Sequence, residues 1–244
     1  MGRHLAAART AADAFLFTAA AHFLPGFPRT ARPDSRWSKT NVRRTERIPR
    51  RQFTLPEARR TLSFWAFTLT LSLQALVITA NTFHVESIFS LAGMDGSKGF
   101  AIFPPIACIS IAVTLFGGWL SDRIELRWLL MIMLAAMGIN LFGFFLLTPG
   151  WPIACLILGG GIANGLFGIL MSVTWPRYFG REHLGAISGL CMTFMVIASA
   201  LGPAVYGGVL RLSSHYAPAN LACFAATLAL LSIAIQAKNP QKKG

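Results

Sequence analysis

The sequence predicts an all-α integral membrane protein: six transmembrane helices that follow a basic, mostly disordered N-terminal segment. Charged residues make up only 13% of the 244 residues, about half the roughly 25% of soluble domains. Six stretches without Asp, Glu, Lys or Arg reach the ~20 residues that a helix needs to cross the hydrocarbon. The basic residues gather at the start, where residues 1–60 hold 13 of the 22 Lys and Arg.

The predicted spans are residues 61–83, 100–121, 128–148, 151–176, 184–210 and 216–237. Backbone groups in lipid must bond to one another, so each span is expected to be a helix. Trp65, Trp119, Trp128, Trp151 and Trp175 fall near span ends, where an indole ring suits the headgroup level. The transmembrane domain is therefore expected over residues 54–237, with a cytoplasmic tail at 238–244.

The distribution of Lys and Arg in the loops predicts the orientation. If the N-terminus is cytoplasmic, the cytoplasmic segments hold seven Lys and Arg even without the N-terminal region, against Lys98 and Arg211 outside. We therefore expect both termini in the cytoplasm and a multi-pass protein of the cell (inner) membrane.

Residues 1–53 form a basic segment for which we expect disorder over most of its length. Residues 29–51 are rich in Pro and Arg and show no periodicity, which is typical of disorder. Nucleic-acid binding is the alternative to attraction by anionic lipid headgroups, and the adjacent membrane span favours lipid. Order is expected to resume at Thr54-Leu-Pro-Glu57, which fits a capping box, and this helix is expected to continue into the first span.

Asp122 closes the second span, where the negative end of the helix dipole disfavours a carboxylate. An unpaired carboxylate at the membrane edge is costly, so a positive group is expected beside it. The candidates are Arg123, Arg127 and the N-terminal turn of another helix. We expect contact with the first turn of the fifth span, around residues 183–185, as a latch that holds one conformational state.

The loop Gly118-x-Leu120-x-Asp122-Arg123 resembles the signature loop of the major facilitator superfamily. Residues 64–65, 83–84 and 175–189 resemble the C-terminal half of bacterial members related to monocarboxylate and oxalate/formate carriers. The resemblance covers about residues 54–237 and implies helices seven to twelve of a twelve-helix carrier. It further implies that the first, second, fourth and fifth spans line a cavity and that the third and sixth face lipid. Glu125 and Leu126 depart from the usual loop pattern.

Small residues predict close helix packing at three places. Gly161 and Gly165 lie in the fourth span, and Gly185 and Gly189 in the fifth. Farther along the fifth span, Gly202-Pro203 predicts a bend because proline lacks a backbone N–H. These patterns fit either static packing or smooth surfaces on which helices slide.

Polar residues near the middles of the spans predict a cavity. The candidates are Gln74, Asn81, Ser110, Asn164, Thr193 and Ser199. Amides inside a membrane must face protein or water, so substrate contact and hydrogen bonds between helices remain alternatives. Asn140, in the third span, breaks the pattern. His84, at the outer end of the first span, is either a proton relay or an interfacial histidine.

The expected function is secondary active transport of a small solute by alternating access, with an organic anion and proton coupling among the candidates. The resemblance to carboxylate carriers implies a cation in the helices that correspond to spans two and five. These spans contain no Lys or Arg, which counts against an oxalate-like substrate. One six-helix half must pair with itself or with another chain. The alternative is a truncated half-carrier or membrane structural partner that does not transport. No enzyme motif, cofactor, metal site or nucleic-acid partner is expected.

Overall fold

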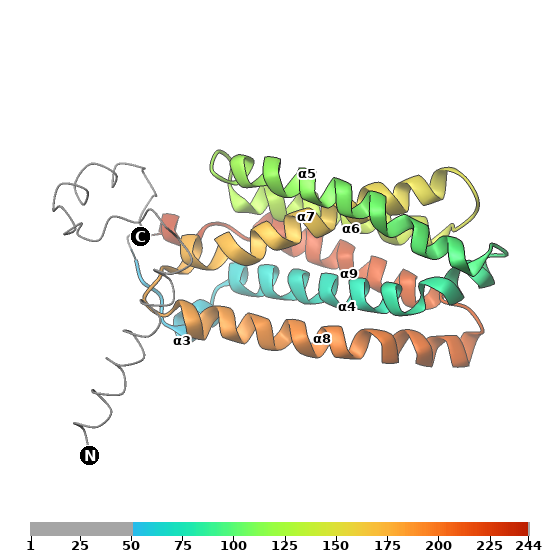
Figure 1. The fold of residues 1–244 in the computed structure, drawn as a ribbon. Helices are drawn as coiled ribbons and strands as arrows, with labels where there is room; N and C mark the ends of the chain where they lie inside the picture. Colours follow the sequence, from blue (N-terminus) through green and yellow to red (C-terminus); the bar gives the residue numbers. More distant parts are fainter. Residues whose placement is uncertain (1–50, 244) are drawn as a thin grey trace, which may run out of the picture. The chain divides into compact units, whose positions relative to one another are not determined.

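The computed structural model describes residues 51–243, which form an all-helical bundle (Figure 1). Six of its helices are long and apolar enough to cross a membrane, which confirms the predicted fold class. The elements are α3 (Leu55–Arg59), α4 (Leu62–Leu91), η1 (Gly96–Ile102), α5 (Phe103–Ser121), α6 (Leu126–Phe145), α7 (Trp151–Phe179), α8 (Leu184–Ser213), α9 (Ala217–Gln236) and η2 (Pro240–Lys243). Most of the segment expected to be disordered, residues 1–50, lies outside the described residues.

The short helix α3 begins at the predicted capping box. The Glu57 carboxylate accepts hydrogen bonds from the Thr54 backbone N–H at 2.8 Å and from the Thr54 hydroxyl at 2.9 Å. The first of these bonds, with a smaller contribution from Arg51, lowers the pKa of Glu57 to about 2. The expected continuation of this helix into the first span is wrong. The helix is interrupted at Thr61, where the backbone is extended. The Thr61 hydroxyl caps α4 by accepting a hydrogen bond from the Phe64 N–H.

The long helices match the predicted spans but differ at their ends. Helix α4 runs to Leu91 rather than residue 83, because Glu86 lies on an exposed face and does not stop the helix. The second span begins earlier than predicted, with the 3₁₀ turn η1 ahead of α5. Trp175, near the end of its helix, is 1% exposed and packs against Phe64 and Phe179 inside the bundle.

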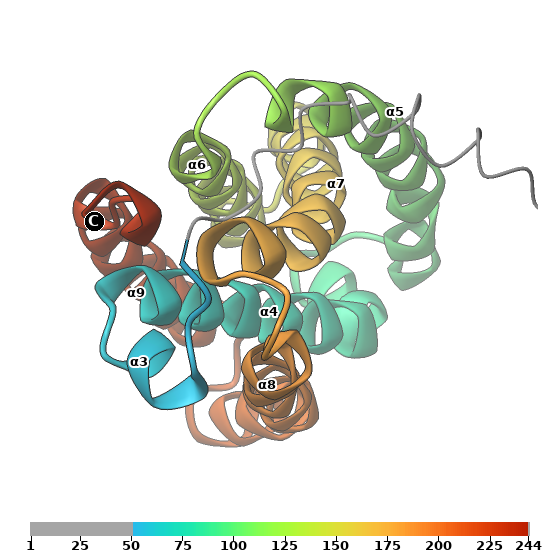
Figure 2. The same cartoon turned by 90° about the vertical axis from the view of Figure 1, so that its left-hand side faces the viewer.

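The six long helices form two layers (Figure 2). Helices α5, α7, α4 and α8 follow one another along an arc, and α6 and α9 pack behind it. The most extensive contacts join α6 to α7, α4 to α8, α5 to α7 and α6 to α9. The arc thus holds the first, second, fourth and fifth spans, which are the four that the family resemblance leads us to expect around a cavity.

Burial differs sharply between the helices. About 61% of the most apolar window is buried in α4 and in α6, but only 11% in α5 and in α8. Helix α6 is therefore not the simple lipid-facing helix expected of the third span, because α7 and α9 cover much of it. The two outer helices of the arc are left largely uncovered by the rest of the described chain.

Candidate functional site

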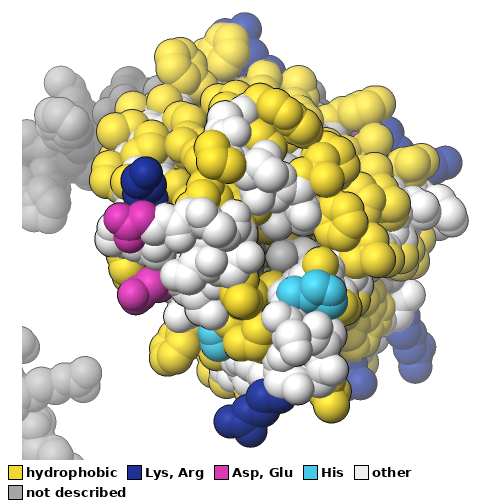
Figure 3. All heavy atoms as spheres, turned by 90° about the vertical axis from the view of Figure 1, so that its right-hand side faces the viewer, with side chains coloured by type: hydrophobic (Ala, Val, Ile, Leu, Met, Phe, Trp, Pro, Cys, Tyr) yellow, Lys and Arg dark blue, Asp and Glu magenta, His cyan; other side chains and the backbone are white. Residues whose placement is uncertain are grey.

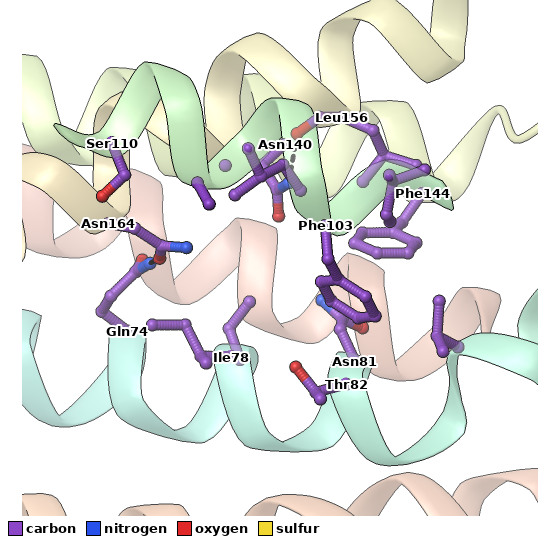
Figure 4. Close-up of a pocket in the computed structure, with 16 residues that line it drawn as sticks. Gln74, Ile78, Asn81, Thr82, Phe103, Ser110, Asn140, Phe144, Leu156 and Asn164 are labelled. Carbon is purple, nitrogen blue, oxygen red and sulfur yellow. Dashed lines mark hydrogen bonds between the residues drawn. The ribbon is translucent and has the colours of Figure 1, made fainter. Parts of the chain in front are cut away.

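A pocket of about 430 Å³ lies between α4, the η1–α5 segment, α6 and α7 (Figure 4). Four of the residues expected to form a cavity line it: Gln74, Asn81, Ser110 and Asn164. Asn140 of the third span lines it as well, although the sequence pattern set this residue aside. The pocket forms where α4 and α5 are joined at one end by η1 and packed on α7.

Hydrogen bonds fix some of the amides around the pocket. The Gln74 Nε2 donates to Asn164 Oδ1 at 2.9 Å, joining α4 to α7. The Asn140 Nδ2 donates to the Leu156 carbonyl at 2.8 Å, joining α6 to α7. The alternative of inter-helix hydrogen bonds therefore describes part of what these amides do.

Other amide atoms at the pocket have no hydrogen-bond partner among the described residues. They are the Gln74 Oε1 and both polar atoms of Asn81, whose side chains are buried at 3% and 6% exposure. A buried polar group left unpaired costs about 1–3 kcal/mol. The pocket thus holds donors and acceptors that the fold itself does not satisfy.

Thr193 and Ser199 do not line the pocket, contrary to the expectation for the fifth span. The Thr193 hydroxyl donates to the Gly189 carbonyl of its own helix at 3.0 Å, and no residue of α8 lines the pocket. The physical reason is the position of α8, which packs on the side of α4 away from α5 (Figure 2), whereas the pocket is lined by residues of α4, η1, α5, α6 and α7.

Helices α4 and α8 come very close at the predicted bend. A Cβ atom on Gly202 would lie 2.6 Å from the Leu76 carbonyl oxygen and 2.8 Å from the Thr79 Oγ1. Pro203 cannot donate to the Ser199 carbonyl four residues earlier, and the Thr79 hydroxyl lies 3.0 Å from that oxygen. The same hydroxyl lies 2.9 Å from the Ala75 carbonyl oxygen of its own helix, so its single hydrogen can be donated either within α4 or across to the carbonyl that the proline leaves free.

His84 joins three helices at the end of the bundle near η1. Its Nε2 lies 3.0 Å from the Pro203 carbonyl oxygen of α8. Its Nδ1 lies 3.1 Å from the hydroxyl of Tyr216, which also lies 3.0 Å from the Ser87 Oγ. A carbonyl only accepts, so Nε2 carries the hydrogen and a neutral ring accepts the Tyr216 bond at Nδ1. No pattern in the sequence points to Tyr216 as the partner of His84.

Asp122 forms an ion pair with Arg177, near the end of α7, and the other nitrogen of that guanidinium group donates to the Ser121 carbonyl. The expected contact with the first turn of α8 is wrong, because α5 packs on α7 and the long α7 brings Arg177 to this loop. Arg123 and Arg127, which were expected alongside Asp122, make other contacts. Arg123 stacks over Trp119, and Arg127 lies 3.6 Å from Glu125 and donates to the Ile235 carbonyl.

The remaining residues of the signature loop shape the turn. The Leu120 carbonyl accepts from the Arg123 N–H at 2.9 Å and from the Ile124 N–H at 3.1 Å. No heavy atom lies within 4 Å of a Cβ built on Gly118. Gly118 therefore leaves the outer surface of α5 open rather than packing on another described helix.

The glycine pairs differ in what they face. Cβ atoms on Gly161 and Gly165 would lie 2.6 Å from Ile109 and 2.7 Å from Val113, so these glycines let α7 pack on α5. Gly185 and Gly189 have nothing within 4 Å. The close approach expected at the second pair is therefore not made to any helix that the structure describes.

Residues 51–53, expected to be disordered, are bound to the end of α7. The Gln52 Oε1 accepts from the backbone N–H groups of Arg181 and Glu182 at 2.8 and 3.2 Å. The Phe53 N–H donates to the Phe179 carbonyl at 2.9 Å, and the two rings pack edge to face. We call residues 51–53 the strap. Its order was not predicted, because nothing in the local sequence pattern indicates a partner more than 100 residues away.

Within residues 51–243, no group of His, Cys, Asp and Glu could hold a metal ion. The four cysteines are free, and Cys191 and Cys223 are buried. The candidate site thus has three parts: a polar pocket, a loop with an ion pair, and a close contact between α4 and α8.

Comparison with known proteins places this architecture in a family. Residues 11–203 match the Major Facilitator Superfamily. A stretch of 126 residues is 31% identical to human Sugar phosphate exchanger 3, and it covers 46% of this chain and 24% of that relative. The aligned part is thus about a quarter of the relative's length. These matches support the superfamily without singling out the monocarboxylate and oxalate/formate branch. The chain is a multi-pass membrane protein that belongs to the Major Facilitator Superfamily.

Proposed function

We propose that this chain is one half of a secondary active transporter that moves a small solute by alternating access. The observation that carries the proposal is the pocket among α4, α5, α6 and α7, whose amides are partly unpaired inside an apolar bundle. Polar groups at membrane depth are expensive and mark solute pathways. The human relative is named as an exchanger, which agrees with a transport role.

The exposed surfaces of α5 and α8 support pairing with a second six-helix half. Large apolar side chains cover both surfaces, among them Leu115 and Phe116 on α5 and Val196 and Leu201 on α8. Gly185 and Gly189 add a smooth stretch on α8. Carriers of this kind bind solute between two halves, and the second half is either another copy of this chain or a separate polypeptide.

We also propose an inner-membrane location with both termini cytoplasmic. The Asp122 loop, the α7–α8 connection and the C-terminal η2 lie at the end of the bundle that carries α3 (Figure 1), and this end holds most of the loop arginines. The opposite end, seen in Figure 3, shows mainly hydrophobic and uncharged atoms with few charged side chains. Reporter fusions after residues 95, 123, 148 and 181 test the proposal, which requires cytoplasmic signals at 123 and 181 alone.

Proton coupling is part of the proposal, with His84 as the group that takes up the proton. Protonation would add a hydrogen at Nδ1 and force the Tyr216 hydroxyl to accept instead of donate. Charged or titratable groups near this junction include Glu86, whose side chain lies beside Gly96 of η1, Tyr206, whose ring packs on Tyr216, and His215, which directly precedes Tyr216. Arg211 lies on α8 as well, beyond Tyr206 in the chain. A pH gradient should drive uptake by wild-type protein and fail to drive uptake by His84→Gln.

The test of transport is uptake by proteoliposomes. Purified chain is reconstituted alone and with a candidate second half, and entry of radiolabelled monosaccharides, sugar phosphates and monocarboxylates is measured against protein-free liposomes. Saturable uptake of one class in either arm is the expected result. Absence of uptake in both arms would overturn the proposal and favour a membrane partner that does not transport.

A further inference from the structure

We infer that the pocket recognises an uncharged solute bearing several hydroxyl groups, such as a monosaccharide or a cyclic polyol, and not an anion. The inference rests on the proposed function, because it names the substrate class of the same pocket. It comes from three properties of the pocket: its lack of charge, its unpaired amides and its size.

No described residue that lines the pocket carries a charge at neutral pH. Moving an ion out of water costs several kcal/mol even in relaxed proteins, unless an opposite charge compensates for it. The closest basic groups in sequence, such as Lys98 and Arg177, belong to the two ends of the bundle. An anion in this pocket would therefore lose hydration and gain no cation from this half.

The unpaired amide atoms include both donors and acceptors, so they match a ligand that both donates and accepts hydrogen bonds. Asn81 offers a carbonyl oxygen and an NH₂ group, and Gln74 offers a free carbonyl oxygen, none of them paired within the described residues. A hydroxyl group both donates and accepts, so it matches either amide atom. In Figure 4, Asn81 and Thr82 come from one side of the pocket and Asn140 and Asn164 from the other.

The rest of the lining suits the carbon skeleton of such a solute. The rings of Phe103 and Phe144 and the side chain of Ile78 supply apolar surface beside the amides (Figure 4). The volume of about 430 Å³ falls within the range of about 300–1,000 Å³ of small-molecule pockets. A solute that displaces the Phe103 ring would reach the Asn81 amide, which lies next to it in Figure 4.

The test is direct binding to the purified full chain in lipid nanodiscs. Tritiated D-glucose, myo-inositol and glucose 6-phosphate are titrated by scintillation proximity, so no transport step is involved. Wild-type protein is compared with Asn81→Leu and with Ser172→Ala. The Ser172 hydroxyl is exposed, bonds to its own helix and lies outside the pocket.

We expect saturable binding of at least one neutral probe and at least tenfold weaker binding of the phosphate ester. Asn81→Leu should weaken neutral binding at least tenfold, since a site built around hydroxyl bonds discriminates strongly, while Ser172→Ala leaves it unchanged. Asn81→Leu should also raise the thermal midpoint, because it removes a buried unpaired amide. That rise would show that the variant folds.

Tighter binding of glucose 6-phosphate than of both neutral probes would overturn the inference, as would unchanged binding by Asn81→Leu or no neutral binding at all. These binding results test the specificity of the pocket independently of the proposed transport function. Uptake of the phosphate ester by proteoliposomes would retain the transporter and reject the neutral solute. Neutral binding without uptake would retain the pocket's specificity and reject transport.

Discussion

Substituting Gly202 with alanine tests the contact between α4 and α8 most directly. The new Cβ would lie 2.6 Å from the Leu76 carbonyl oxygen, 2.8 Å from the Thr79 Oγ1 and 3.3 Å from the Ala80 nitrogen. Two of these atoms are backbone atoms of α4, so they cannot rotate away. The two helices must separate, or one of them must bend further.

The size of the effect follows from two opposing terms. Overpacking of this kind costs about 1–3 kcal/mol, and replacing glycine by alanine inside a helix gains about 1 kcal/mol. Gly189→Ala is the matched control, since Gly189 lies in the same helix and has nothing within 4 Å of its Cβ position. The control carries only the favourable term, so the two variants should differ by about 1–3 kcal/mol.

The assay is equilibrium unfolding of purified protein in mixed micelles as the mole fraction of SDS rises, followed by far-ultraviolet circular dichroism. Gly202→Ala should unfold at lower SDS than Gly189→Ala. Free energies of unfolding that agree within about 0.5 kcal/mol, less than the smallest overpacking cost of about 1 kcal/mol, would refute the argument that backbone contact fixes the distance between α4 and α8.

Three other predictions concern the end of the bundle that carries α3. Gly180→Ala should release the strap and speed hydrogen exchange in residues 51–53, since Gly180 has a φ of +91° and a Cβ there would strike Gln52; unchanged exchange would contradict it. Asp122→Asn should lower the free energy of unfolding by less than about 1 kcal/mol, because Asp122 and Arg177 are 69% and 37% exposed; a loss of several kcal/mol by SDS unfolding would contradict it. The pKa of Glu57 is lowered to about 2. The contribution of its carboxylate to the stability of α3 is therefore complete above pH ~4.5 and is lost as the pH falls toward 2. Exchange of α3 amides should rise over that window in wild type but not in Glu57→Gln, and equal profiles would count against the cap.

The fold could be predicted because lipid imposes a length and a lack of charge that are visible in one sequence. The ends of the helices were less predictable, because helices extend beyond the bilayer, as α4 does past Glu86. The loss of the helical donor to the Ser199 carbonyl at Pro203 has a local chemical cause, but the Thr79 hydroxyl beside that carbonyl belongs to another helix.

The site was predictable in kind and less so in detail. Gln74 and Asn164 stand out as amides in apolar spans, and they do meet. Asn140 was set aside because a family pattern placed its helix toward lipid, whereas its side chain reaches the pocket from behind. The partner of Asp122 was missed because a dipole argument considers nearby helix ends and cannot foresee that α7 brings Arg177 across.

The packing of α4 has a consequence for how the protein is made. Helix α4 is the first of the six long helices to leave the ribosome, yet its main partner α8 begins only at residue 184. At about 5–20 residues per second, translation leaves α4 without that partner for about 6–25 s. Gln74 gains its partner Asn164 when α7 is made, but the surface of α4 that α8 covers in the finished bundle stays open to lipid, the translocon or an insertion chaperone for the whole interval. Membrane insertion of this chain should therefore depend on a holding factor for its first helix more than for its last.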